Sequence, residues 1–96
     1  MTPSGEMAQV EVRRLVIVNE RGLHARAAAK FVATAGTFTS EIVVTRDGTS
    51  VSGRSIMGLM MLAAGQGSTI EVSASGSDSG AALAALEALV GNRFDE

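Results

Sequence analysis

Hydrophobic and polar positions alternate with two different periods along this chain, and each change of period predicts a new element. Residues 10–18 are rich in β-branched side chains and end at the turn-prone sequence Asn-Glu-Arg-Gly, which predicts a first strand. Residues 25–35 are apolar and rich in alanine, which predicts a helix. Gly36 follows and is expected to end this helix, because glycine adopts left-handed backbone at no steric cost.

The remainder of the chain continues this alternation. The predicted elements are a strand at 41–45, an Asp47-Gly48 hairpin turn, a strand at 49–52, a helix at 55–64, a strand at 69–74 and a helix ending near Val90. Asp78 is expected to cap the last helix with its side chain. Two apolar faces are predicted to be buried: Ile70, Val72 and Ala74 on the strand, and Leu83, Leu86 and Val90 on the helix, flanked by Ala82 and Leu89.

The predicted order of elements is therefore β-α-β-β-α-β-α. This order is typical of an α+β open-faced β-sandwich, in which an antiparallel or mixed sheet carries its helices on one face and leaves the other face to solvent. A length of 96 residues fits a single domain, which we expect at 10–96. Residues 1–9 show no signal-peptide pattern and are expected to form a flexible N-terminal tail.

Composition narrows the classes of function. The chain has no cysteine, which excludes a catalytic thiol, a thiolate metal site and a disulfide-rich fold. Aromatic residues are 3% of the chain and the formal charge is -2, which argues against a nucleic-acid partner. The longest apolar run is too short to span a bilayer. We therefore expect a cytoplasmic protein without membrane insertion, metal or organic cofactor.

The only histidine, His24, stands directly before the predicted first helix. A helix N-terminus presents backbone N–H groups without partners and a partial positive charge, so it favours an oxyanion. Arg26 adds a cation whose planar fork suits phosphate oxygens. The same positive field opposes protonation of the imidazole, and a neutral imidazole keeps the lone pair of a nucleophile. One interpretation is that His24 attacks a phosphoryl group and that Arg26 and the helix end hold its oxygens.

Other interpretations of this histidine remain open from the residues alone. A lone histidine at a helix start is usually a surface or capping residue. A metal site would need further ligands, and the chain offers no second histidine and no cysteine. A hydrolase triad would need another histidine as its base.

Several stretches together resemble HPr, the histidine-containing phosphocarrier family of the bacterial phosphotransferase system. The resemblance is carried by residues 22–26 (Gly-Leu-His-Ala-Arg), 38–42, the Gly48 hairpin, 55–59 and Gln66-Gly67, and it extends over residues 10–90. It implies the fold of that family, a four-stranded antiparallel sheet with three helices on one face.

The resemblance also implies a function. His24 would take a phosphoryl group on its Nδ1 atom from phosphorylated enzyme I and pass it to EIIA-type acceptors, while Arg26 steadies the phosphate. Such a protein is a carrier in a relay more than an enzyme with its own turnover, and we expect a monomer between transient complexes. Whether its acceptors serve sugar import or a regulatory relay is left open by the sequence.

Two positions depart from common family patterns. Ala27 stands where many members have proline, a residue that fixes φ in a first helical turn, so the helix start is expected to fray more easily. Arg21 stands where some relatives carry a small polar capping residue, so a cap must come from elsewhere or be absent.

The helix predicted at 55–64 has no charged residue. Its buried side is expected to be Leu59, Leu62 and Ala63, and its exposed apolar patch to be Ile56, Met57 and Met60. An alternative is that some of its methionines fill the core, an interpretation favoured more for Met61 than for Met57. The resemblance implies that the patch and the His24 loop together form the docking surface for enzyme I and the EIIA acceptors.

Ser55 is expected to be the N-cap of this helix. In part of the HPr family the matching serine is also phosphorylated, by an HPr kinase/phosphorylase. A phosphate there would place about two negative charges beside the apolar patch, so we expect it to weaken docking on enzyme I.

Two functions of other classes compete with the phosphocarrier. A ferredoxin-like regulatory or small-ligand-binding module uses a similar order of elements, and it would bind its ligand without regard to His24. An adaptor would use the methionine patch alone.

Overall fold

The computed structural model describes residues 10–96, and the tail expected at 1–9 lies outside the described residues. The elements follow the predicted order and end in one additional short helix. Their bounds are β1 (Val10–Val16), α1 (Ala25–Ala35), β2 (Glu41–Arg46), β3 (Thr49–Ser52), α2 (Ile56–Met61), β4 (Thr69–Ser75), α3 (Ser79–Gly91) and the 3₁₀ helix η2 (Arg93–Asp95).

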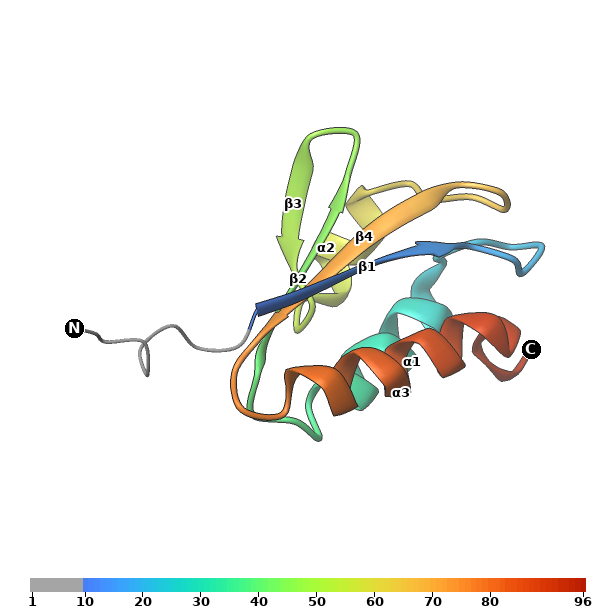
Figure 1. Ribbon diagram of the computed structural model, residues 1–96. Coiled ribbons are helices and arrows are strands. Elements are labelled where there is room, and N and C mark those ends of the chain that lie inside the picture. The colour runs from blue at the N-terminus through green and yellow to red at the C-terminus, as the bar shows by residue number, and fades with distance from the viewer. Residues whose placement is uncertain (1–9) are drawn as a thin grey trace.

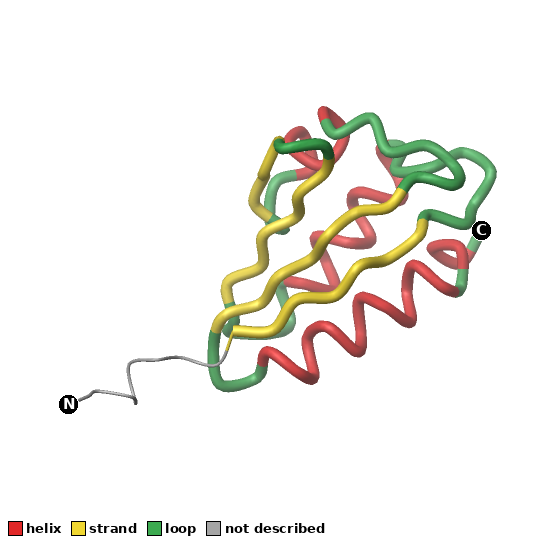
Figure 2. Tube along the Cα trace, turned by 45° about the horizontal axis from the view of Figure 1, so that its top comes forward, coloured by secondary structure: helices red, strands yellow, loops and turns green. Residues whose placement is uncertain are grey.

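The four strands form one sheet in the order β1-β4-β2-β3, and every neighbouring pair is antiparallel. This arrangement confirms the predicted open-faced α+β fold. Helices α1 and α3 run side by side beneath the sheet, and Figures 1 and 2 show that its other face carries no helix. Strands β1 and β2, which α1 connects, lie on either side of β4 and are both antiparallel to it.

The core lies between the sheet and the helices. The predicted inner face of β4 is fully buried, as is the side of β2 beside it. The predicted stripe of α3 is also buried, and this helix packs against β1 and β4. The opposite face of the sheet is mostly polar, but it carries three exposed valines of β1 (Val10, Val12 and Val16) and the half-buried Val43 of β2. The Asp47-Gly48 turn joins β2 to β3 with positive φ at both residues, as a tight hairpin requires.

Two predicted helix ends are formed differently. Gly36 closes α1 with a φ of -68°, so its left-handed freedom is not used there. Asp78 occupies the N-cap position of α3 but makes no side-chain cap. Its carboxylate instead accepts hydrogen bonds from the backbone and hydroxyl groups of Thr39 and Ser40, 38 or 39 residues away. The side chain therefore joins two loops and leaves the helix start uncapped.

Helix α2 is shorter than predicted. It ends at Met61, and Ala63 follows with a φ of 52°, so Ala63 is exposed and the next residue, Ala64, takes its place in the core. Leu59 and Leu62 are buried as expected. Met61 is 76% exposed, which makes the core-filling interpretation wrong for this residue.

The chain ends in a turn that the hydrophobic pattern does not predict. Arg93, Phe94 and Asp95 all have φ between 55° and 62°, a left-handed conformation that non-glycine residues rarely adopt in succession. The Phe94 side chain is buried in the core, and the Lys30 ammonium donates to the Phe94 carbonyl oxygen at 2.8 Å. These contacts bring the last residue, Glu96, back to the start of α1.

Within residues 10–96, no helix has both the length and the apolar character needed to cross a membrane.

Candidate functional site

His24 occupies the N-cap position of α1, the place predicted from the sequence. Its backbone is extended, with φ -79° and ψ -178°, and the helix begins at the next residue. The imidazole is 17% exposed, so the ring is partly covered yet reaches solvent. The structure thus places the histidine at the open end of the helix rather than in the core.

The backbone amides of the first turn of α1 face the same end. The first helical hydrogen bond runs from the Ala28 N–H to the His24 carbonyl oxygen at 2.8 Å, and no side chain caps the helix. The N–H groups of Ala25, Arg26 and Ala27 therefore precede the first helical bond. Together with the helix dipole they favour a negatively charged group at this end. Ala27 is fully buried in this turn.

The loop that leads into α1 is fixed against the segment after α2. Leu23 is buried, and its N–H donates to the Ala64 carbonyl oxygen at 2.9 Å. Gly22 has a φ of +68°, and a Cβ at this position would stand 2.6 Å from the same Ala64 oxygen. A glycine is therefore required at position 22 both by its conformation and by the close approach. This packing sets the position of His24.

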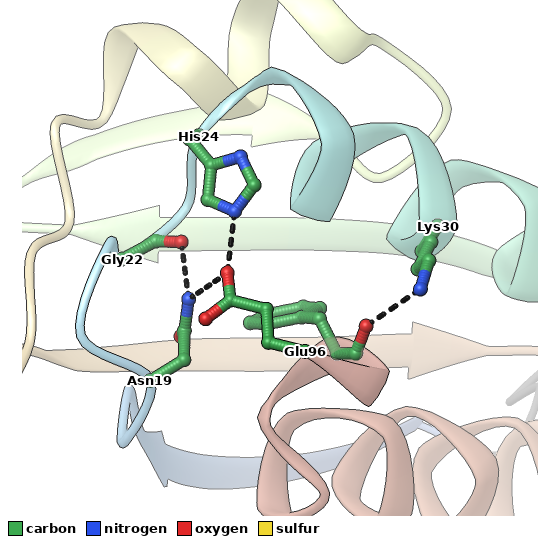
Figure 3. A network of polar contacts seen from close by, with 6 residues as sticks. Asn19, Gly22, His24, Lys30 and Glu96 are labelled. Atoms are coloured by element: carbon green, nitrogen blue, oxygen red, sulfur yellow. Dashed lines mark hydrogen bonds and ion pairs between the residues drawn. The ribbon is translucent and has the colours of Figure 1, made fainter.

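A carboxylate that sequence reasoning missed contacts the histidine. The Glu96 Oε2 atom lies 2.6 Å from the His24 Nε2 atom and accepts a hydrogen bond from the Asn19 Nδ2 atom at 3.1 Å. The same Asn19 nitrogen donates to the Gly22 carbonyl oxygen at 2.7 Å, and Figure 3 shows these groups gathered on one side of the imidazole. No periodic pattern points to residue 96, because the contact depends on the left-handed turn before it.

The hydrogen bond from His24 lowers the pKa of the Glu96 carboxyl below its ordinary value. The bond from Asn19 and the positive charge of Arg21 act in the same direction, while partial burial opposes them. Glu96 is therefore a carboxylate at neutral pH. A group that only accepts hydrogen bonds thus faces Nε2, while Figure 3 shows the other ring nitrogen on the opposite side of the ring.

The two arginines nearest to His24 in the sequence remain on the surface. Arg26 is exposed, and its guanidinium forms no hydrogen bond or ion pair with residues 10–96. Arg21 is also exposed and does not cap α1. The structure thus places Arg26 in the first turn, near the open amides, without direct contact to the ring. Its guanidinium is available to an incoming anion.

Ser55 and the apolar patch lie on α2, whose end leads to the segment that holds the His24 loop. The Ser55 hydroxyl accepts a hydrogen bond from the Gly58 N–H at 2.9 Å, which confirms the predicted N-cap. Met57 is 71% exposed, and Ile56 and Met60 are each 40% exposed, as predicted for the patch. Met61 extends it. Helices α1 and α2 are in contact, so the patch is carried by a helix that packs against the helix beginning after His24.

The described residues, 10–96, contain no cluster of three or more histidine, aspartate or glutamate side chains suited to a metal ion.

Comparisons with known proteins find similar sequences and structures. A family described as the PTS HPr component phosphorylation site matches residues 12–92. The chain is 50% identical over 84 residues to the phosphocarrier protein HPr of Cupriavidus necator, covering 88% of this chain and 94% of that protein. It is similar to the crystal structure of HPr-C-His from Thermoanaerobacter tengcongensis, with a TM-score of 0.86, 43% identity and coverage of 90% and 97%. A crystal structure of an HPr dimer from the same organism matches with a TM-score of 0.73 and 46% identity, covering 83% and 92%.

Proposed function

Because this chain belongs to the HPr family of the phosphotransferase system, we propose that it relays a phosphoryl group from phosphorylated enzyme I to EIIA-type acceptors through a phosphohistidine at His24. The observation that carries this proposal is the position of His24. Its ring reaches solvent at the uncapped end of α1, and the Glu96 carboxylate contacts one of the two ring nitrogens, Nε2.

The chemical step uses the nitrogen that faces away from Glu96. The Nδ1 lone pair of the neutral His24 ring forms a bond to phosphorus while the bond between phosphorus and the donor atom of enzyme I breaks. The bonding electron pair leaves with the donor. Nε2 keeps its proton throughout, and the Glu96 carboxylate beside it balances the positive charge that develops on the ring. Transfer to an acceptor reverses these steps.

The charge of the phosphoryl oxygens is met by the first turn of α1. The N–H groups of Ala25, Arg26 and Ala27 have no helical acceptor, so they are free to donate to these oxygens. The exposed Arg26 guanidinium supplies a permanent cation with two parallel donors. Both interactions favour a doubly charged phosphoryl group over an empty site, which supports a phosphohistidine that is stable enough to be carried.

The exposed patch Ile56, Met57, Met60 and Met61 is proposed as the main docking surface for enzyme I and the EIIA-type acceptors. The contact of α2 with α1 supports a single surface that presents the phosphoryl group to each partner in turn. Phosphorylation of Ser55, by an HPr kinase/phosphorylase where the organism has one, would place negative charge at the edge of this surface and weaken docking.

The protein is proposed to act in the cytoplasm, as a monomer between transient complexes. Because one similar structure is an HPr dimer, the oligomeric state of the unphosphorylated protein should be measured in solution. Both sugar import and a regulatory relay are compatible with the same carrier chemistry.

The relay is tested by onward transfer. Enzyme I, phosphoenolpyruvate, magnesium and an EIIA-type acceptor are combined with this protein, with His24→Ala or with Ser55→Asp, and phosphorylation of the acceptor is followed by mass spectrometry. We expect transfer with the unaltered protein, none with His24→Ala and slower transfer with Ser55→Asp. Ser55→Ala is the matched control and should transfer at nearly the unaltered rate. Acceptor phosphorylation that continues with folded His24→Ala would refute the proposal.

A further inference from the structure

Glu96 contacts the Nε2 atom of His24, and the buried Asn19 donates a hydrogen bond to the same Glu96 oxygen. We infer that Asn19 and Glu96 act as a pair of positioning residues that keep the ring proton on Nε2 and thereby direct the phosphoryl group to Nδ1. The inference rests on the proposed function, because it concerns which atom of the His24 ring receives the group.

The contacts determine where the proton lies. A carboxylate oxygen 2.6 Å from Nε2 accepts hydrogen bonds and donates none, so the N–H of a neutral imidazole must be on Nε2. The lone pair is then on Nδ1, the nitrogen that Figure 3 shows on the side of the ring away from Glu96. Glu96 also covers Nε2 directly. A phosphoryl donor therefore meets a protonated, shielded nitrogen on one side and a free lone pair on the other.

Asn19 holds this carboxylate in register with the histidine loop. Its side chain is fully buried, and its Nδ2 atom donates both to the Gly22 carbonyl oxygen and to the Glu96 oxygen that contacts His24. The reverse orientation of the amide would set its own oxygen against two other oxygens, so the two bonds fix the orientation. Asn19 thus ties the residue two positions before His24 to the carboxylate that contacts its ring.

The position of Glu96 is built into the fold. The three residues before it have a left-handed backbone conformation, which is unfavourable for residues other than glycine: Arg93, Phe94 and Asp95. The buried Phe94 ring and the bond from Lys30 to the Phe94 carbonyl oxygen keep the turn in place. The turn therefore sets the position of Glu96 beside His24.

A small donor tests the inference without enzyme I. Phosphoramidate transfers its phosphoryl group to a histidine ring: a ring nitrogen bonds to phosphorus, the P–N bond of the reagent breaks, and its nitrogen leaves as ammonia with the bonding electrons. The positions of the proton and of the phosphoryl group are read from the ¹⁵N and ³¹P resonances of the full-length protein. Glu96→Ala is compared with Glu87→Ala, which removes an equally charged residue of α3 that pairs with Arg13.

The unaltered protein and Glu87→Ala are expected to hold the proton on Nε2 and to be phosphorylated on Nδ1. In Glu96→Ala the proton should be shared between the two nitrogens. The ratio of Nε2 to Nδ1 product should rise roughly tenfold, as for the loss of one hydrogen bond to a charged group. An unchanged tautomer and an unchanged product ratio in folded Glu96→Ala would overturn the inference.

Asn19→Ala is expected to shift the same ratio in the same direction by a smaller factor. If Asn19 acts through Glu96, the protein with both Asn19→Ala and Glu96→Ala should give the same product ratio as Glu96→Ala alone. A larger shift of the product ratio in this double variant would overturn the pairing. Should Asn19→Ala not fold, Asn19→Ser takes its place, because a hydroxyl retains a donor of shorter reach. The two claims can fail separately. If phosphoramidate gives the predicted product ratios but enzyme I transfers no phosphoryl group, the proposed function is refuted and the inference about the ring stands.

Discussion

At the scale of single residues, side chains distant in the sequence hold the loops of this fold together. Asp78 is the clearest case, because its carboxylate accepts hydrogen bonds from the backbone N–H groups and the hydroxyls of Thr39 and Ser40. These bonds, with the Ser40 hydroxyl contributing most, lower the pKa of Asp78 from 3.8 to about 2. The charged carboxylate is therefore the form that the folded state prefers.

This preference predicts how stability depends on acid. A carboxyl whose pKa is lower in the folded state stabilises the fold above its unfolded pKa of 3.8, and that contribution is lost as the pH falls towards about 2. Asp78→Asn should lower the free energy of unfolding at neutral pH, and its difference from the unaltered protein should shrink between pH 3.8 and about 2. Urea unfolding at several pH values measures both.

Glu87→Gln is the control for this comparison, since Glu87 forms an exposed ion pair with Arg13 that should contribute less than about 1 kcal/mol. A difference for Asp78→Asn that stays constant across the acid range would contradict the assigned role of the carboxylate.

At the scale of elements, α2 combines a buried side with an exposed apolar side in only six residues. Leu59 anchors it to the core, and Ser55 satisfies an N–H of its first turn. An ordinary surface helix would solvate its outer side with charged residues. The exposed methionines of α2 contribute little to the fold, so their role is expected in contacts with partners.

Met57→Ser tests this role of α2. The side chain is 71% exposed, so its truncation should change the free energy of unfolding by no more than about 0.5 kcal/mol. The rate of phosphoryl uptake from enzyme I at limiting protein concentration should fall by roughly fivefold or more, as for an interface residue that contributes at least ~1 kcal/mol. A quenched-flow assay of phosphoryl transfer from enzyme I measures that rate.

Val12→Ser is the matched control, because Val12 is 50% exposed on the face of the sheet without helices. Its uptake rate should equal that of the unaltered protein. Equal rates for Met57→Ser and Val12→Ser would show that the patch on α2 does not dock enzyme I.

At the scale of the whole molecule, the order of elements, the buried faces of β4 and α3 and the position of His24 followed from periodicity, turn residues and helix-end chemistry. Those features are local, so the sequence carries them directly. The contact of Glu96 with His24 and the bonds of Asp78 join residues far apart in the chain, and they depend on how the packed elements meet. The left-handed turn at Arg93–Asp95 likewise depends on the burial of Phe94. Local propensity does not favour such a turn, because non-glycine residues rarely adopt left-handed backbone.

The central claim is that the His24 imidazole accepts a phosphoryl group. Its most direct test is the intact mass of the full-length protein after incubation with enzyme I, phosphoenolpyruvate and magnesium, followed by the same measurement on His24→Ala and Ser55→Ala. The account predicts one added phosphoryl group, lost in mild acid, on the unaltered protein and on Ser55→Ala, and none on His24→Ala. A phosphoryl group on folded His24→Ala, or none on the unaltered protein, would contradict it.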